Sequence, residues 1–315
     1  MARWCASQGA QVTVADTRDQ PPGLQVLQQA WPAVRCLRGA FTADLLQQSA
    51  ARAVFRSPGL APDEIAPAFD AARSIGLWLG GELDLFLRAL AELRESRAYA
   101  PRILAVTGTN GKTTVTALTG QLLERAGRRV AVAGNIGPTL LDTLSEALAR
   151  DDLPEDWVLE LSSFQLDGVT GFEPTAATLL NLSQDHLDWH GSLQAYAAAK
   201  ARVFGQQGLM VLNRDDAAVL AMCPPPPAVR TRGPRTPQRP WCSFGSDLPG
   251  RPGDFGLEEV NGMVWLVRAH NDDAPGNSRR GETPEIHLQR LMPADALRLR
   301  GRHNALNALA ALALG

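Results

Sequence analysis

A glycine-rich run that ends in lysine and threonine is the part of the sequence best suited to chemistry. Residues 103–107 are apolar and predict a buried strand, which leads into Gly108-Thr109-Asn110-Gly111-Lys112-Thr113-Thr114 and then into helical sequence. Backbone N–H groups of such a turn converge on an anion, and the helix N-terminus adds the positive end of its dipole. Lys112 supplies a mobile cation and the Thr113 hydroxyl is placed to reach Mg²⁺. The run therefore predicts a site for a nucleoside triphosphate.

This run departs from the common phosphate-loop pattern at one position. That pattern has glycine six residues before the lysine, where this sequence has Val106, so the match is to a compact form. The alternative is a glycine-rich turn in an unrelated α/β domain. The order of strand, glycines, lysine, hydroxyl and helix favours the phosphate site.

Further short apolar runs end in polar residues. Residues 130–134 lead to Asn135, residues 157–161 contain Glu160, and residues 177–181 lead to the turn Gln184-Asp185-His186. Strands that alternate with helices predict right-handed crossovers and a mostly parallel sheet. Ligands of such sheets bind at the carboxyl ends of the strands, so we expect these polar residues and Gly108 to meet in one crevice.

Glu160 lies between Leu159 and Leu161, which predicts a buried carboxylate. A buried charge needs a partner, and a cation is the natural one. The alternative is a strand-end carboxylate that caps the next helix, and we favour the metal interpretation.

The composition describes an ordinary globular protein with room for about two domains. Of the 315 residues, 45% are hydrophobic and 20% are charged, with a formal net charge of −2, so nothing favours nucleic acid or a membrane as partner. The four scattered cysteines predict reduced thiols rather than disulfides or a zinc site. The first residues lack the apolar core of a secretory signal, so we expect a cytoplasmic protein.

Two domains are expected, over residues 1–97 and 98–315. The first contains a strand over 11–15, a strand over 53–55 and a helix over 82–93, and a linker over 96–101 follows. The strand over 11–15 is typical of the second strand of a nucleotide-binding unit, so we expect the chain to lack its true beginning. In the second domain we expect a proline-rich excursion over about 222–240, short antiparallel strands over 241–244 and 262–267, a turn over 271–273, and residues 299–307 leading into a final Ala/Leu-rich helix.

Five motifs resemble those of the Mur ligases, and the resemblance covers essentially the whole sequence. They are residues 107–114, Gly134-Asn135-Ile136-Gly137, residues 159–166, Asp185-His186-Leu187-Asp188 and Gly301-Arg302-His303-Asn304. The resemblance implies an α/β fold with a partial Rossmann-like first domain, a central P-loop ATPase domain and an absent C-terminal ligase domain. Within the family, residues 159–166, Asp16-Thr17-Arg18 and Ser57-Pro58-Gly59 are similar to the branch that adds D-glutamate.

The reaction implied by this resemblance is ATP-driven amide formation. A substrate carboxylate attacks the γ-phosphate of ATP, and an amine then attacks the acyl phosphate. The implied substrates are UDP-N-acetylmuramoyl-L-alanine and D-glutamate, in peptidoglycan precursor synthesis. The alternatives are another Mur-type or folylpolyglutamate-type ligase, or a nucleotide-binding module without catalysis. We expect a monomer, and we expect this chain alone to be unstable or inactive as a ligase.

The resemblance also assigns roles to residues around two Mg²⁺ ions. Lys112 would neutralise phosphate charge, Thr113 and Glu160 would hold one ion, and His186 and a carbamylated Lys200 would hold the second. Carbamylation needs a neutral amine, so burial near cations must lower the pKa of Lys200. From the residues alone, His186 would be structural and Lys200 a solvated helix charge.

The remaining implied residues bind the substrates. ATP would contact Gly108, Thr109, Asn110, Gly111, Lys112, Thr113 and Thr114, with Asn304 and Asn307 near the adenine; these asparagines could equally cap the last helix. The uridine diphosphate would contact Asp16, Thr17, Arg18, Ser57 and Gly59. The muramoyl-alanine portion would contact Asn135 and Ser162, with Ser163 as a helix cap.

Overall fold

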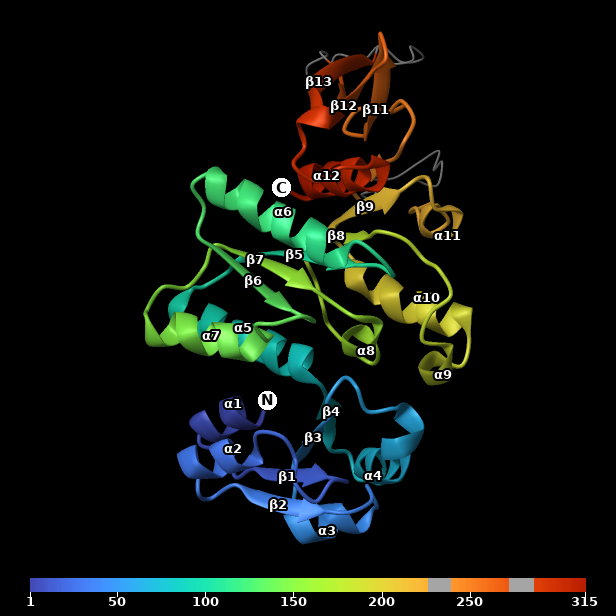
Figure 1. Ribbon diagram of the computed structural model, residues 1–315. Coiled ribbons are helices and arrows are strands. Elements are labelled where there is room, and N and C mark those ends of the chain that lie inside the picture. The colour runs from blue at the N-terminus through green and yellow to red at the C-terminus, as the bar shows by residue number, and fades with distance from the viewer. Residues whose placement is uncertain (226–238, 272–285) are drawn as a thin grey trace, which may run out of the picture.

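The computed structural model describes residues 1–225, 239–271 and 286–315. Figure 1 shows a small first domain below a larger layered domain, with a strand-rich extension beyond the central sheet. The expected proline-rich excursion and the turn over 271–273 fall mostly outside the described residues.

The first domain consists of short helices and two small parallel sheets. Its elements in order are α1 (Ala2–Ser7), β1 (Thr13–Asp16), α2 (Leu24–Ala30), β2 (Arg35–Arg38), α3 (Asp44–Ser49), β3 (Ala53–Phe55), α4 (Pro62–Ser74) and β4 (Trp78–Gly80). Strand β1 pairs with β2, and β3 pairs with β4. Three buried side chains, Phe41, Ile65 and Ala68, form its own apolar cluster.

The larger domain is built on a sheet that has nine strands among the described residues, in the order β13-β12-β11-β10-β9-β8-β5-β7-β6. The strands are β5 (Arg102–Thr107), β6 (Val130–Gly134), β7 (Asp156–Glu160), β8 (Ala176–Leu179), β9 (Leu209–Asn213), β10 (Trp241–Phe244), β11 (Phe255–Val260), β12 (Met263–His270) and β13 (His287–Pro293). Pairs from β6 to β11 are parallel, while β12 pairs antiparallel with β11 and β13. The expected α/β class with a mostly parallel sheet is confirmed.

Helices cover both faces of this sheet. On one face lie α5 (Glu82–Arg97), α7 (Leu140–Ala149), α8 (Ser163–Leu166), α9 (Leu187–His190) and α10 (Leu193–Ala201), while α6 (Lys112–Arg125) and α12 (Arg302–Leu314) lie on the other (Figure 1). A short helix, α11 (Ala217–Leu220), follows β9, and 3₁₀ turns occupy η1 (Arg202–Phe204) and η2 (Ala294–Ala296). Successive strand side chains point to opposite faces. Accordingly, Ile103 and Ala105 enter one core cluster, and Leu104 and Val106 enter the other.

Two expectations about the larger domain change. The strand over 241–244 is β10, which runs parallel to β9 and β11 rather than antiparallel. Local sequence gives no direction to a strand; the direction follows from how the connection before it returns across the sheet. Helix α5, placed in the first domain by the sequence analysis, packs its apolar face on the central core, where Phe86 lies edge-on to Trp157 with ring centroids 4.9 Å apart. We therefore propose that the division between the two cores lies near Gly81.

Candidate active site

The turn between β5 and α6 is held too tightly for side chains at its two glycines. Gly111 has φ +84°, and a Cβ there would lie 2.7 Å from Asn307 Oδ1. A Cβ on Gly108, with φ +156°, would lie 3.0 Å from the Leu180 Cβ. The glycines of the motif are therefore required by the close approach of Leu180, which follows β8, and of Asn307 on α12.

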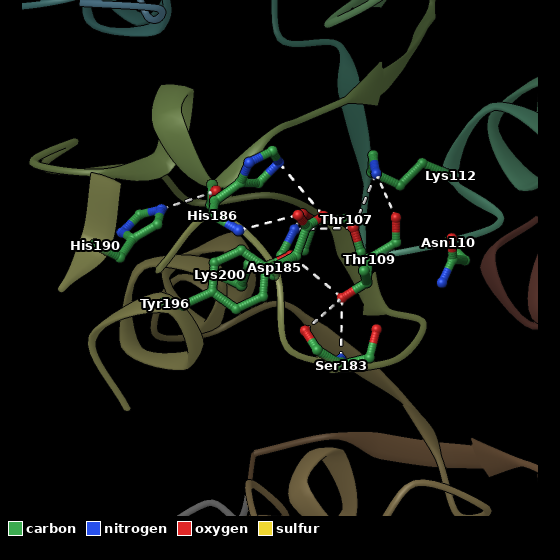
Figure 2. Close-up of polar contacts among 12 residues, drawn as sticks. Thr107, Thr109, Asn110, Lys112, Ser183, Asp185, His186, His190, Tyr196 and Lys200 are labelled. Carbon is green, nitrogen blue, oxygen red and sulfur yellow. Dashed lines mark hydrogen bonds and ion pairs between the residues drawn. The ribbon is translucent and has the colours of Figure 1, made fainter. Parts of the chain in front are cut away.

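Both lysine side chains of the protein meet in this turn. The sequence contains two lysines, Lys112 and Lys200, among 31 lysine and arginine residues. Lys112 Nζ donates to the carbonyls of Gly108 and Thr109 at 2.9 and 3.0 Å, and Lys200 Nζ donates to the same Gly108 carbonyl at 2.8 Å (Figure 2). Lys200 Nζ also donates to Thr107 Oγ1 at 3.3 Å. Two ammonium groups thus share one carbonyl oxygen.

Burial of this pair lowers the pKa of both amines. Lys200 is 2% exposed, and burial together with the charge of Lys112 lowers its pKa to about 7. Burial also lowers the pKa of Lys112, against the opposing effects of Glu160 and Asp185. The interpretation of Lys200 as a solvated charge, made from the residues alone, is wrong because α10 turns that side chain inward under the phosphate loop. With a pKa of about 7, a substantial fraction of the Lys200 amine is neutral and nucleophilic near neutral pH, whereas an arginine would stay charged.

Glu160 ends β7 beside this turn. Its carboxylate is 4% exposed, and among the described residues it accepts a hydrogen bond from Asn135 Nδ2 at 3.1 Å. The neighbouring Gly134 is obligatory, because a Cβ there would lie 2.0 Å from the Glu160 carbonyl oxygen. Glu160 does not cap α8; Ser162 does, with Ser162 Oγ accepting from Gln165 N at 3.3 Å. The capping alternative for Glu160 therefore fails.

Ser162 takes the capping role that the sequence suggested for Ser163. Ser162 is the helix cap, and Ser163 is buried, with its Oγ 2.9 Å from His190 Nε2. His190 in turn stacks on Phe164, with an interplanar angle of 10° and ring centroids 5.8 Å apart. Burial lowers the pKa of His190. These contacts join α8 to α9 and fix the wall of the site.

His186 and Asp185 lie at the start of α9, close to the two lysines in Figure 2. His186 is half exposed, has φ +51°, and its Nε2 lies 3.5 Å from Asp185 Oδ2. Its ring centroid lies 4.7 Å from that of Phe164. Tyr196, on α10, places its hydroxyl 3.2 Å from Thr109 Oγ1 and its ring under Lys200 Nζ, at 4.8 Å from the centroid.

A cleft of about 330 Å³ lies between the two domains, lined by α4 on one side and by Phe164 and Gln165 of α8 on the other. Arg56, which follows β3, crosses it and donates to Asp167 Oδ2 at 2.8 Å. The same guanidinium lies over Trp189 at 5.2 Å from the ring centroid. Arg56 therefore joins the first domain to the wall of the candidate site.

The other predicted residues are placed less centrally. Thr113 is exposed at the start of α6, and Asn307 touches the loop while its Nδ2 donates to Asn304 Oδ1 at 3.2 Å. Asp16 pairs with Arg18 at 2.7 Å in the first domain, where Thr17 also lies. The turn of Ser57 and Gly59 lies beside the interdomain cleft, which Pro58 lines.

Sequence reasoning did not single out several residues that shape the site. Asn181, Tyr196, Arg56 and Trp189 are the main ones. Asn181 carried a signal, since it ends the strand run at the same edge as the phosphate loop. The other three carried none, because each depends on which helix or domain faces the loop.

The donor atoms fit a hard cation without forming a closed cage. In the part of the chain that the structure describes, no three His, Cys, Asp or Glu side chains gather as a metal site. A buried carboxylate with one amide partner and an exposed threonine hydroxyl beside a phosphate loop are, however, the oxygen donors that Mg²⁺ prefers when phosphates complete its shell. The set fits Mg²⁺ bound together with a nucleotide.

Comparison with known proteins identifies the family. The model described as Mur ligase MurD-like, N-terminal domain, matches residues 1–79, and the Mur ligase middle domain model matches residues 106–229. A relative from a Polaromonas species, named UDP-N-acetylmuramoylalanine--D-glutamate ligase, is 50% identical over an alignment that takes in all of this chain and 68% of the relative. The chain belongs to the Mur ligase family.

Other relatives agree with this placement. A protein of the same name from Albidiferax ferrireducens is 63% identical over 314 residues, and this Mur ligase chain spans 62% of its length. The solved structure of UDP-N-acetylmuramate:L-alanyl-gamma-D-glutamyl-meso-diaminopimelate ligase from Neisseria meningitides matches with a TM-score of 0.52 at 19% identity, covering 99% of this chain and 87% of that one. The latter likeness supports the fold alone. Within the described residues, no helix is long and apolar enough to cross a membrane.

Proposed function

We propose that this Mur ligase takes part in ATP-dependent amide formation, adding D-glutamate to UDP-N-acetylmuramoyl-L-alanine. The observation that carries the proposal is the meeting of Lys112, Lys200 and Glu160 at one edge of the parallel sheet. The names of its relatives specify D-glutamate as the added amino acid. We further propose a cytoplasmic monomer, in keeping with four free cysteines.

Each residue of this group has a physical task in phosphoryl transfer, which depends mainly on positioning and electrostatics. Lys112, now bonded to two loop carbonyls, would exchange them for phosphate oxygens. The N–H groups of residues 111–113, at the start of α6, would face the same anion. Asn135, which holds Glu160, and His186 would face the acyl portion of the substrate. The buried walls would keep water from the acyl phosphate.

We propose that Thr113 and Glu160 hold one Mg²⁺, and that His186 and carbamylated Lys200 hold a second. Such ions would supply charge neutralisation for the transferring phosphoryl group. The lowered pKa of Lys200 supports carbamylation, because the neutral amine is the form that adds CO₂.

Nucleotide binding is the first test. The chain should bind MgATP in calorimetry, and Lys112→Ala should weaken binding by about tenfold to a hundredfold through loss of charge-assisted contacts. Lys112→Arg is the matched control, since it keeps the charge at this point. Equal affinity of the wild type and Lys112→Ala for MgATP would contradict the proposal.

Amide formation is the second test. The product is measured by mass spectrometry with UDP-N-acetylmuramoyl-L-alanine and a panel of D-glutamate, L-alanine and diamino acids. Because the chain spans 62% of the Albidiferax relative, the assay also uses a fusion in which that relative supplies the segments outside the match. We expect product with D-glutamate from the fusion. Product with another amino acid alone would favour a different ligase of this type, and nucleotide binding without any product would favour a non-catalytic module.

Carbamylation can be tested directly because the sequence has two lysines. With ¹³C-bicarbonate, and with the N-terminal amine blocked by acetylation, we expect one carbamate signal in the ¹³C spectrum that disappears in Lys200→Arg and persists in Lys112→Arg. A signal that survives Lys200→Arg would refute this assignment.

A further inference from the structure

Asn181 makes a two-point clamp on the phosphate loop. Its Oδ1 accepts from Asn110 N at 2.8 Å, and its Nδ2 donates to Asn110 O at 3.1 Å. Its own carbonyl accepts from Thr109 N at 3.0 Å. One residue at the tip of β8 thereby bonds three backbone groups in the middle of the loop, in the manner of a paired strand.

The residues on either side of Asn181 are held by the end of β9 and by the turn that follows it. On one side, Asn213 Nδ2 donates to Leu180 O at 2.7 Å, and Asn213 is 8% exposed. On the other side, Leu182 N donates to Asp216 Oδ2 at 2.7 Å. These two bonds fix the backbone on both sides of Asn181, so the position of its side chain relative to the loop is fixed as well.

From these contacts we propose that Asn181 is a positioning residue for nucleotide binding. It uses the N–H groups of Thr109 and Asn110 to fix the loop, so that the N–H groups of residues 111–113 face the phosphates. This inference rests on the proposed ATP site. The physical reason is that a loop of two glycines loses much backbone freedom when it closes on an anion. A clamp that orders the loop before the nucleotide binds reduces the conformational entropy lost on binding, so the affinity is higher.

Two substitutions separate the parts of the clamp. Asn181→Ala removes both side-chain bonds, and we expect MgATP to bind about tenfold more weakly, as for the loss of two modest hydrogen bonds. Asn181→Asp keeps the acceptor for Asn110 N but sets a carboxylate oxygen against Asn110 O, so we expect a loss at least as large at pH 8. The matched control is Asn261→Asp, an identical change in the exposed turn between β11 and β12.

The pH dependence distinguishes positioning from a general structural effect. Once the carboxylate introduced by Asn181→Asp takes up a proton, the side chain regains a donor for the Asn110 carbonyl. The MgATP affinity of Asn181→Asp, divided by that of the wild type at the same pH, should therefore rise as the pH falls from 8 toward the ordinary aspartate pKa of about 4, while the ratio for Asn181→Ala should stay flat. Hydrogen exchange at the Asn110 amide should be faster in Asn181→Ala than in the wild type without nucleotide, because the acceptor for that amide is lost.

The outcomes separate this inference from the proposed function. If the wild type fails to bind MgATP, the proposed function fails. If the wild type binds and Asn181→Ala binds equally well, or if exchange at the Asn110 amide is unchanged in Asn181→Ala, the clamp is refuted while the ATP site stands. Weakened binding with a flat pH ratio for Asn181→Asp would likewise overturn the clamp.

Discussion

Lys200 should make the stability of the folded protein rise with pH. Its pKa is lowered from 10.5 to about 7 in the folded state, while the unfolded chain keeps the ordinary value. Between these values the unfolded state binds one more proton, so the free energy of unfolding increases as pH rises. The slope for one proton is about 1.4 kcal/mol per pH unit. Below pH 7 both states are protonated and this dependence vanishes.

The perturbation that exposes this effect is Lys200→Met, which fills the buried space without an ionisable group. Urea unfolding followed by tryptophan fluorescence, in bicarbonate-free buffer, gives the unfolding free energy of both proteins at pH 7, 8 and 9. The wild type should gain about 2 to 3 kcal/mol relative to the variant across this range. In Lys112→Met the gain should begin at higher pH, because the like charge that lowers the pKa of Lys200 is gone. A difference between wild type and Lys200→Met that does not change with pH would refute the reasoning.

Three further predictions concern the frame of the site. Gly134→Ala should lower the free energy of unfolding in urea by about 2 to 3 kcal/mol, because its Cβ would clash with the Glu160 carbonyl. Gly127→Ala, at φ +80° but with open space around it, should lower it by about 1 kcal/mol. Equal losses in the two variants would contradict the steric argument. Burial would raise the pKa of Asp156, but hydrogen bonds from two arginines outweigh burial and lower that pKa, so the stability that the Asp156 carboxylate contributes should be lost as the pH falls below about 4. The melting temperature of Asp156→Asn should therefore fall less with acid than that of the wild type. An equal fall in both proteins would contradict this prediction. Arg56→Ala should lower the free energy of unfolding in urea by about 1 to 2 kcal/mol, because it removes the interdomain ion pair with Asp167. Arg73→Ala removes an exposed ion pair and should lower it by less than about 0.5 kcal/mol. Similar small losses in both variants would show that the Arg56–Asp167 pair does not stabilise the domain contact.

The sequence alone predicted the central architecture because its signals are local. A strand that runs into glycines, lysine and a helix indicates a phosphate loop wherever it occurs, and alternating strands and helices predict a parallel sheet with its ligands at one edge. For the same reason Gly108, Asn135 and Glu160 could be placed together before any coordinates. Their roles in chemistry stay predictions.

Other features were decided by tertiary structure. Nothing near Lys200 in the sequence says that its amine lies under the phosphate loop, because the pKa of an amine depends on burial and on a like charge 88 positions away. The direction of β10, the packing of α5 on the second core and the burial of Ser163 against His190 likewise depend on which surfaces meet. Local sequence determines which helices and strands form and which side chains they bear. Burial and the contacts between charges on distant elements arise only when the chain has folded, so local sequence does not determine them.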